Sequence, residues 1–136
     1  MTMTTGKLAR AAHVGIETIR FYERRGLVEP TARLASGYRV YSEAAVTRIQ
    51  FIRKAQQLGF TLNEIGELIE LDTDASATCG EVRDRTLDKI AALERKIAVL
   101  QGMKAELETL ANSCDGDRPM KDCRVRECLT GACEPS

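Results

Sequence analysis

The sequence predicts a mainly α-helical protein with a winged helix-turn-helix, a long helix for antiparallel coiled-coil pairing and a short cysteine-containing tail loop. Three observations predict this fold class. Two short amphipathic stretches flank a tight turn near the N-terminus, apolar residues recur in heptads between residues 80 and 113, and the composition then shifts to Asp, Gly, Pro and Cys. With 136 residues, the chain has room for one or two small modules but not for a large substrate-binding core.

The first two helices are expected over residues 6–12 and 16–25. Thr5 can cap the first helix, residues 13–15 form a tight turn, and Gly26 can end the second helix. The expected inward side chains of the second helix are Ile16, Ile19 and Phe21. Two short helices joined by a small turn form the helix-turn-helix motif.

A small β-ribbon, or wing, is expected next. The Ser36-Gly37 turn signal precedes a strand-like alternation over residues 38–41. An amphipathic helix is then expected over residues 43–58. Residues 61–64 fit a capping box, which predicts one more helix running to about Leu71.

Residues 72–79 are expected to form a linker, because most of them are small or acidic. The heptads that follow are typical of a two-helix coiled coil. Their a and d positions hold Ile90, Leu93, Ile97, Leu100 and Leu107, with Lys104 and Ala111 as weaker a positions and Cys114 at the next d position.

The cysteines lie at both ends of this long helix. At about 1.5 Å rise per residue, the helix holds Cys79 and Cys114 of one chain roughly 50 Å apart, so one chain cannot bring both to one ion. If two chains pair antiparallel, Cys79 of one chain lies beside Cys114 of the other. Cys123 follows across a loop long enough to fold its sulfur onto the same ion. The sequence thus predicts three thiolates shared between subunits, which favour soft or borderline cations over Mg(II) or Ca(II).

Charge is distributed unevenly although the formal net charge is zero. Residues 1–54 carry 10 Lys and Arg against 4 Asp and Glu, and residues 55–136 carry 10 against 16, so the two parts have charges of +6 and −6. A basic surface suits a polyanion, because phosphate neutralisation supplies most non-specific nucleic-acid affinity. A merely solvated charged surface is the alternative.

The chain is expected to be cytoplasmic and to have no membrane partner. No apolar run reaches the roughly 18 residues that a bilayer requires, and residues 1–10 lack the apolar core of a signal peptide. In a reducing compartment, five cysteines favour metal or redox chemistry over disulfides. An enzyme is not expected, because the sequence has no nucleophile elbow, phosphate loop or HExxH motif.

A helix-turn-helix that reads DNA needs an exposed polar face on its second helix and basic groups that reach phosphates. Thr18 and Arg20 are best placed for base edges. Tyr22 and Tyr38 could instead pack in the interior, and Tyr41 is expected in the core. The predicted DNA-binding residues are Glu17, Thr18, Arg20, Tyr22, Arg24, Arg25, Tyr38 and Arg39.

Three segments carry a family resemblance: ETIRFYERRGL at residues 17–27, GYRVY at 37–41 and QLGFTLNEI at 57–65. Together they closely resemble the MerR family of transcription regulators, and the match spans essentially the whole chain. The resemblance implies a homodimer whose long helices pair antiparallel on promoter DNA. It also implies repression without the effector, and activation of RNA polymerase by DNA distortion with it.

The predicted domain organisation follows from these signals and this resemblance. It comprises a winged helix-turn-helix DNA-binding domain at 1–71, a linker at 72–79, a dimerisation helix at 80–113 and a metal-binding loop and tail at 114–136.

The mercury-sensing branch of the family has three cysteines at the same offsets as Cys79, Cys114 and Cys123. The resemblance therefore implies Hg(II) as the effector, held by Cys79 of one subunit and Cys114 and Cys123 of the other in a planar three-sulfur site. No organic cofactor is expected. Relatives that sense Pb(II) or Cd(II) use a similar cysteine set. Zn(II) sensors tend to add a loop histidine, whereas His13 is the only histidine here.

The resemblance does not favour Cu(I), because Cu(I) sensors of the family have a shorter two-cysteine loop and lack a cysteine at the position of Cys79. Two alternatives stay open. Cys128 and Cys133 depart from the simplest mercury-sensor pattern, and they could add a fourth ligand, form a weaker second site, deliver metal or have no role. A thiol redox switch is a further alternative, although iron–sulfur relatives show C-x2-C and C-x-C spacings that this chain lacks.

Overall fold

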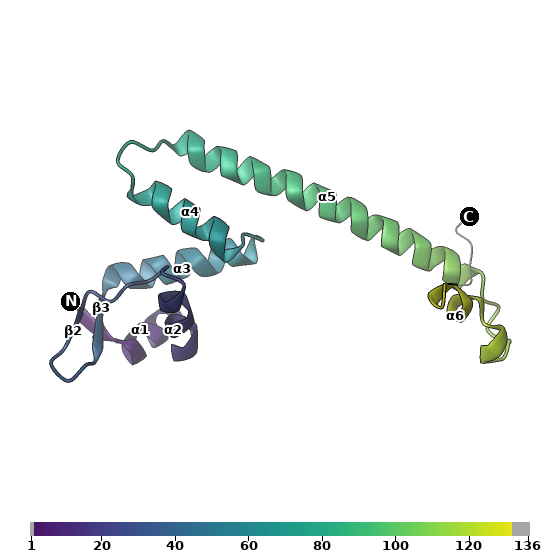
Figure 1. Ribbon diagram of the computed structural model, residues 1–136, viewed down its shortest axis with the longest axis horizontal. Coiled ribbons are helices and arrows are strands. Elements are labelled where there is room, and N and C mark those ends of the chain that lie inside the picture. The colour runs from purple at the N-terminus through teal and green to yellow at the C-terminus, as the bar shows by residue number, and fades with distance from the viewer. Residues whose placement is uncertain (1, 132–136) are drawn as a thin grey trace. The chain divides into compact units, whose positions relative to one another are not determined.

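The computed structural model describes residues 2–131, and the chain divides into two compact units, Met1–Lys89 and Ile90–Ser136. The predicted fold class is confirmed: the protein is mainly helical, with a helix-turn-helix, a small antiparallel sheet and a long C-terminal helix (Figure 1). In chain order, the elements are β1 (Thr2–Thr4), α1 (Thr5–Ala12), α2 (Ile16–Arg24), β2 (Ala32–Arg33), β3 (Arg39–Ser42), α3 (Glu43–Gln57), α4 (Leu62–Thr73), α5 (Cys79–Asn112), the 3-10 helix η1 (Met120–Asp122) and α6 (Arg124–Leu129).

The wing belongs to a three-stranded antiparallel sheet with the order β1-β3-β2. Met3 of β1 lies opposite Tyr41, and Ala32 of β2 lies opposite Val40. The sequence did not predict β1, because three residues are too few to show a strand periodicity. Pairing with β1 makes β3 the central strand, so the wing is anchored to the segment that leads into α1.

The core of the first unit lies among α1, α2, α3, α4 and β3. Its six largest fully buried side chains are Tyr41, Leu8, Ile19, Ile49, Ile52 and Ile65. Each buried aliphatic side chain stabilises the fold by about 1.5–3 kcal/mol relative to exposure. The expected burial of Tyr41 is confirmed.

The predicted inward orientation is wrong for two of the three side chains named on α2. Ile16 and Phe21 are 42% and 39% exposed, whereas Ile19 and Tyr22 are buried. Ile19 and Tyr22 are three residues apart and share a helix face, while Phe21 points about 200° away from Ile19 around the axis. Ile16 begins the helix, so it lies at the end of the buried stripe.

Local capping signals mostly agree with the observed helix ends. The capping box of α4 is confirmed, because Thr61 Oγ1 accepts from the Glu64 amide at 3.2 Å and Glu64 Oε1 accepts from the Thr61 amide at 2.8 Å. The cap predicted for α1 is wrong by one residue. Thr4 is the N-cap, and its hydroxyl accepts from the Lys7 amide at 3.3 Å.

α5 has no buried residue in the single chain. The apolar residues at its heptad positions are all at least partly exposed, from Leu93 at 37% to Leu100 at 61%. A helix with an apolar stripe that its own chain does not cover is typical of an interface. Within residues 2–131, no helix combines the length and apolar character that crossing a membrane would require.

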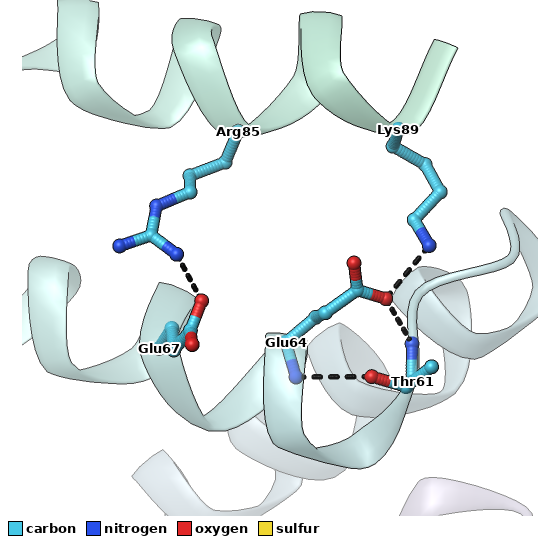
Figure 2. Close-up of polar contacts among 5 residues, drawn as sticks. All are labelled: Thr61, Glu64, Glu67, Arg85 and Lys89. Atoms are coloured by element: carbon cyan, nitrogen blue, oxygen red, sulfur yellow. Dashed lines mark hydrogen bonds and ion pairs between the residues drawn. The ribbon is translucent and has the colours of Figure 1, made fainter. Parts of the chain in front are cut away.

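α4 and the start of α5 are held together by a pair of ionic contacts, which we call the α4–α5 clasp (Figure 2). Lys89 Nζ donates to Glu64 Oε1 at 2.7 Å, and Arg85 pairs with Glu67. The Lys89 ammonium also lies 5.4 Å from the centre of the Phe60 ring. Glu64 thus serves both the capping box and the clasp, so one carboxylate joins the start of α4 to α5.

Replacing Glu64 with Gln should make unfolding less sensitive to acid. The hydrogen bond from Lys89, together with the Thr61 amide, lowers the pKa of Glu64 from 4.5 to about 2. A lowered folded-state pKa contributes stability at pH values above the unfolded pKa, and this stability is lost as the pH falls from about 4.5 towards about 2. Because Glu64 is partly exposed, we expect a loss of only about 0.5–1 kcal/mol at pH 7.

Thermal melts followed by circular dichroism between pH 7 and pH 2 test this expectation. Glu70→Gln is the matched control, because Glu70 is an exposed carboxylate on the same helix. Identical pH profiles for Glu64→Gln and the wild type would show that the Glu64 carboxylate does not stabilise the protein.

Candidate functional site

The helix-turn-helix is built by a left-handed residue between two short helices. His13 ends α1 with φ of 58°, and the following Val14 amide donates to the Ala9 carbonyl at 2.9 Å. Arg53 of α3 donates to the His13 carbonyl at 3.2 Å, so the turn is also tied to the core helix. These contacts fix the direction in which α2 leaves the turn.

The outer face of α2 is polar, as a DNA-reading helix requires. Glu17 and Arg20 have side chains that are 82% and 53% exposed, and they form an ion pair at 3.1 Å. Thr18 is partly exposed, and Arg24 is exposed. Arg25 donates to Asn63 Oδ1 at 3.3 Å, which connects the end of α2 to the start of α4. Because the Glu17–Arg20 pair is at the surface, little free energy is needed to separate it.

Tyr22 differs from the other predicted DNA-binding residues. Its side chain is 3% exposed, and its hydroxyl donates to Gln56 Oε1 of α3 at 2.7 Å. Burial raises the pKa of Tyr22, and the nearby Arg53 charge opposes that effect. In this structure Tyr22 is therefore a core residue that joins α2 to α3, rather than an exposed phosphate donor. The sequence could not reveal the partner, because Gln56 lies 34 residues further along the chain.

The wing presents both of its predicted DNA-binding residues towards the surface. Gly37 has φ of 89° in the turn, a conformation that glycine adopts without strain. Tyr38 next to it is 70% exposed. Arg39 is the first residue of β3, and its side chain is 36% exposed. Its Nε lies 3.3 Å from Oε2 of Glu23 in α2. Sequence reasoning did not identify Glu23 as a functional residue.

The cysteines are divided between the two units. Cys79 is the first residue of α5 and is exposed, whereas Cys114 follows the end of α5 and is also exposed. Cys123 is partly exposed and is the N-cap of α6. Cys128 lies within α6, and Cys133 lies outside the described residues.

Within one chain the predicted thiolate site is not assembled. Among residues 2–131, no three His, Cys, Asp or Glu side chains are grouped so that they could hold a metal ion. Cys79, Cys114 and Cys123 are free thiols. A site completed by a second subunit stays a prediction.

Two family models match the chain. One, described as MerR HTH family regulatory protein, matches residues 3–72, and the other, described as MerR, DNA binding, matches residues 46–110. Together they extend from β1 into the second half of α5.

Curated relatives and solved structures are similar over nearly the whole chain. The HTH-type transcriptional regulator CueR of Escherichia coli O157:H7 is 40% identical over 96% of this chain and 96% of its own. The mercuric resistance operon regulatory protein of Bacillus cereus is 39% identical over 95% of this chain and 98% of its own. The transcription regulator PbrR691 of Ralstonia metallidurans CH34, crystallised with lead(II), has a TM-score of 0.85 and 34% identity, covering 93% of this chain and 98% of its own.

Proposed function

Since the chain belongs to the MerR family of transcription regulators, we propose that it is a metal-responsive regulator of a heavy-metal resistance promoter, with Hg(II) as its effector. Members of this family are DNA-binding proteins and not enzymes. The observation that carries the metal response is a set of three free thiols: Cys79 at the start of α5, Cys114 just beyond its end and Cys123 at the N-cap of α6.

The protein acts as a homodimer on double-stranded promoter DNA. α2 and the wing contact the operator, and α5 supplies the interface between subunits. The uncovered apolar stripe of α5 supports this role, because burying it requires a second helix. Without metal the dimer represses the promoter, and with metal it distorts the DNA so that RNA polymerase can use it.

An antiparallel pairing brings the thiols of two subunits together. Cys79 and Cys114 are equally far from a point between residues 96 and 97. If the twofold axis passes α5 there, Cys79 of one subunit is level with Cys114 of the other. Leu93 then faces Leu100 of the partner subunit, so the same pairing also forms an apolar layer.

The three thiolates fit a soft cation. The ion would be held by Cys79 of one subunit and by Cys114 and Cys123 of the other. Metal binding would therefore tie the tail of one subunit to the start of α5 in its partner. The α4–α5 clasp attaches the start of α5 to α4. A displacement of the start of α5 would therefore be transmitted to α4 and through it to the helix-turn-helix. Thiolates prefer Hg(II), Pb(II) and Cd(II) to hard cations.

Lead(II) is the second candidate effector, because PbrR691 is the relative of similar structure that was crystallised with lead(II). Similarity to the mercuric resistance regulator of Bacillus cereus favours Hg(II). Both candidates use the same thiolates, so they differ in the ion and not in the site.

A promoter-fused reporter dosed separately with Hg(II), Pb(II), Cd(II), Zn(II) and Cu(I) should respond to Hg(II) at the lowest concentration. A Cys128→Ser/Cys133→Ser double variant should respond at the same Hg(II) concentration, because the proposal assigns the site to the other three cysteines. A lower threshold for another ion would overturn Hg(II) as the effector. A response that is lost in the double variant would show that the tail pair contributes to the site.

A further inference from the structure

We propose that Glu23 is a positioning residue that holds the Arg39 guanidinium of the wing in place for a DNA phosphate. This inference rests on the proposed DNA-binding function. It concerns a carboxylate on α2 that neither composition nor helical periodicity identified.

Glu23 joins α2 to the wing. It lies near the end of α2, its side chain is only 11% exposed, and its Oε2 lies 3.3 Å from Arg39 Nε. The other carboxylate oxygen, Oε1, is buried and accepts no hydrogen bond from any described residue. Placing a carboxylate in such surroundings costs free energy, so this pair is better explained by the geometry that it imposes than by net stability.

Arg39 needs a counter-charge because of its position in the sheet. Arg39 of β3 lies directly opposite Arg33 of β2. Like charges at directly opposed positions of an antiparallel pair repel each other. Arg33 is exposed and Arg39 is partly exposed, so without Glu23 the guanidinium of Arg39 would move away from Arg33 into solvent.

The contact with Glu23 leaves most of the guanidinium free. A guanidinium has five N–H donors, and a contact at Nε leaves the four on its terminal nitrogens. Those terminal groups are the ones that bind phosphate oxygens with two parallel hydrogen bonds. Arg39 held at Nε and partly exposed is therefore oriented in advance for a phosphate.

If Glu23 acts only through its charge, removing the carboxylate should change the DNA affinity in one direction. If Glu23 positions Arg39, the change should be in the opposite direction. A negative charge near bound DNA weakens binding, so removing it should tighten binding to any duplex. If Glu23 positions Arg39, removing its charge should instead weaken binding to the operator. The sign of the change therefore distinguishes the two roles.

The experiment compares wild type, Glu23→Gln, Arg39→Ala and the double variant on a duplex selected in vitro for binding to the wild-type dimer. Kd is measured by fluorescence anisotropy over a range of salt concentrations. Glu23→Gln should weaken binding by about 100-fold, which is about tenfold for each of the two charge-assisted contacts of the dimer. The slope of log Kd against log salt concentration should fall by about 2 for the dimer, because each subunit loses one phosphate contact. In the Arg39→Ala background, Glu23→Gln should leave binding unchanged or make it tighter.

Glu29→Gln is the matched control, because it removes the same charge from an exposed position in the same unit. It should change Kd by less than about twofold, as expected for a single screened surface charge. Arg39→Lys keeps the charge but lacks the Nε donor, so it should bind more weakly and be insensitive to Glu23→Gln. That variant tests the proposal independently if Glu23→Gln does not fold.

Two outcomes would overturn the proposal. Tighter binding by Glu23→Gln would show that the carboxylate only opposes DNA. Equal weakening in the wild-type and Arg39→Ala backgrounds would show that Glu23 acts on the fold and not through Arg39. Failure of the wild-type dimer to select any duplex would refute the proposed function instead, and so is distinguishable from both.

Discussion

Replacing Cys79 with Ser should abolish metal-dependent activation while leaving operator binding nearly unchanged. Cys79 is exposed at the start of α5 and is not part of the core, so the substitution should not disturb the fold. Serine does not supply a soft thiolate, and metal affinity should fall by on the order of 100-fold or more. The measurements are operator binding, Hg(II) binding and reporter induction.

Mixed dimers make the test specific to a site shared between subunits. Cys79→Ser and Cys114→Ser homodimers should each lack both sites. A mixed dimer of the two variants retains one complete set, in which Cys79 of the Cys114→Ser subunit meets Cys114 and Cys123 of the Cys79→Ser subunit. It should therefore bind one ion, measured on differently tagged, co-purified subunits.

A site confined to one subunit makes the opposite prediction for the mixed dimer. Each subunit would then lack one of its own ligands, and no high-affinity metal binding would return. Normal induction in the Cys79→Ser homodimer would also contradict the shared site.

Replacing Arg20 with Ala should remove specific operator binding while the protein still folds and dimerises. The Arg20 side chain is 53% exposed on the outer face of α2, and its only contact among the described ion pairs is the surface pair with Glu17. A good contact between an arginine and a base is worth about 1–3 kcal/mol. A dimer with two such contacts should therefore lose about 2–6 kcal/mol of binding free energy on the operator.

Binding to a scrambled duplex should fall much less, because phosphate contacts carry most of the non-specific affinity. Arg95→Ala is the control, since Arg95 is an exposed cation on α5 outside the helix-turn-helix. Equal losses on operator and scrambled duplex would mean that Arg20 contacts phosphate and not bases. Sedimentation of the free protein checks that dimerisation is unaffected.

Local patterns made much of the fold predictable. The capping box at Thr61 and Glu64, the turn at Gly37 and the heptads of α5 depend on residues within a few positions of one another. Helical periodicity also indicated the exposed polar face of α2. β1 was missed because a three-residue strand is recognised only through its pairing with β3.

The candidate site was predictable to the extent that its residues act as individual side chains. The exposed positions of Arg20 and Tyr38 follow from a helix face and a turn. The positions of Tyr22, Glu23 and Arg39 depend on contacts with elements distant in sequence, and no local pattern indicates those contacts.

The sequence by itself determined the helix-turn-helix, the wing, the long helix and the spacing of the cysteines, because turns, caps and heptads are short-range signals. Only the tertiary structure decided that Tyr22 is buried against α3, that Lys89 and Arg85 hold α4, and that Glu23 faces the wing. Periodicity specifies which face of a helix is apolar. It does not specify which other element that face meets, because the meeting depends on how all the elements pack together.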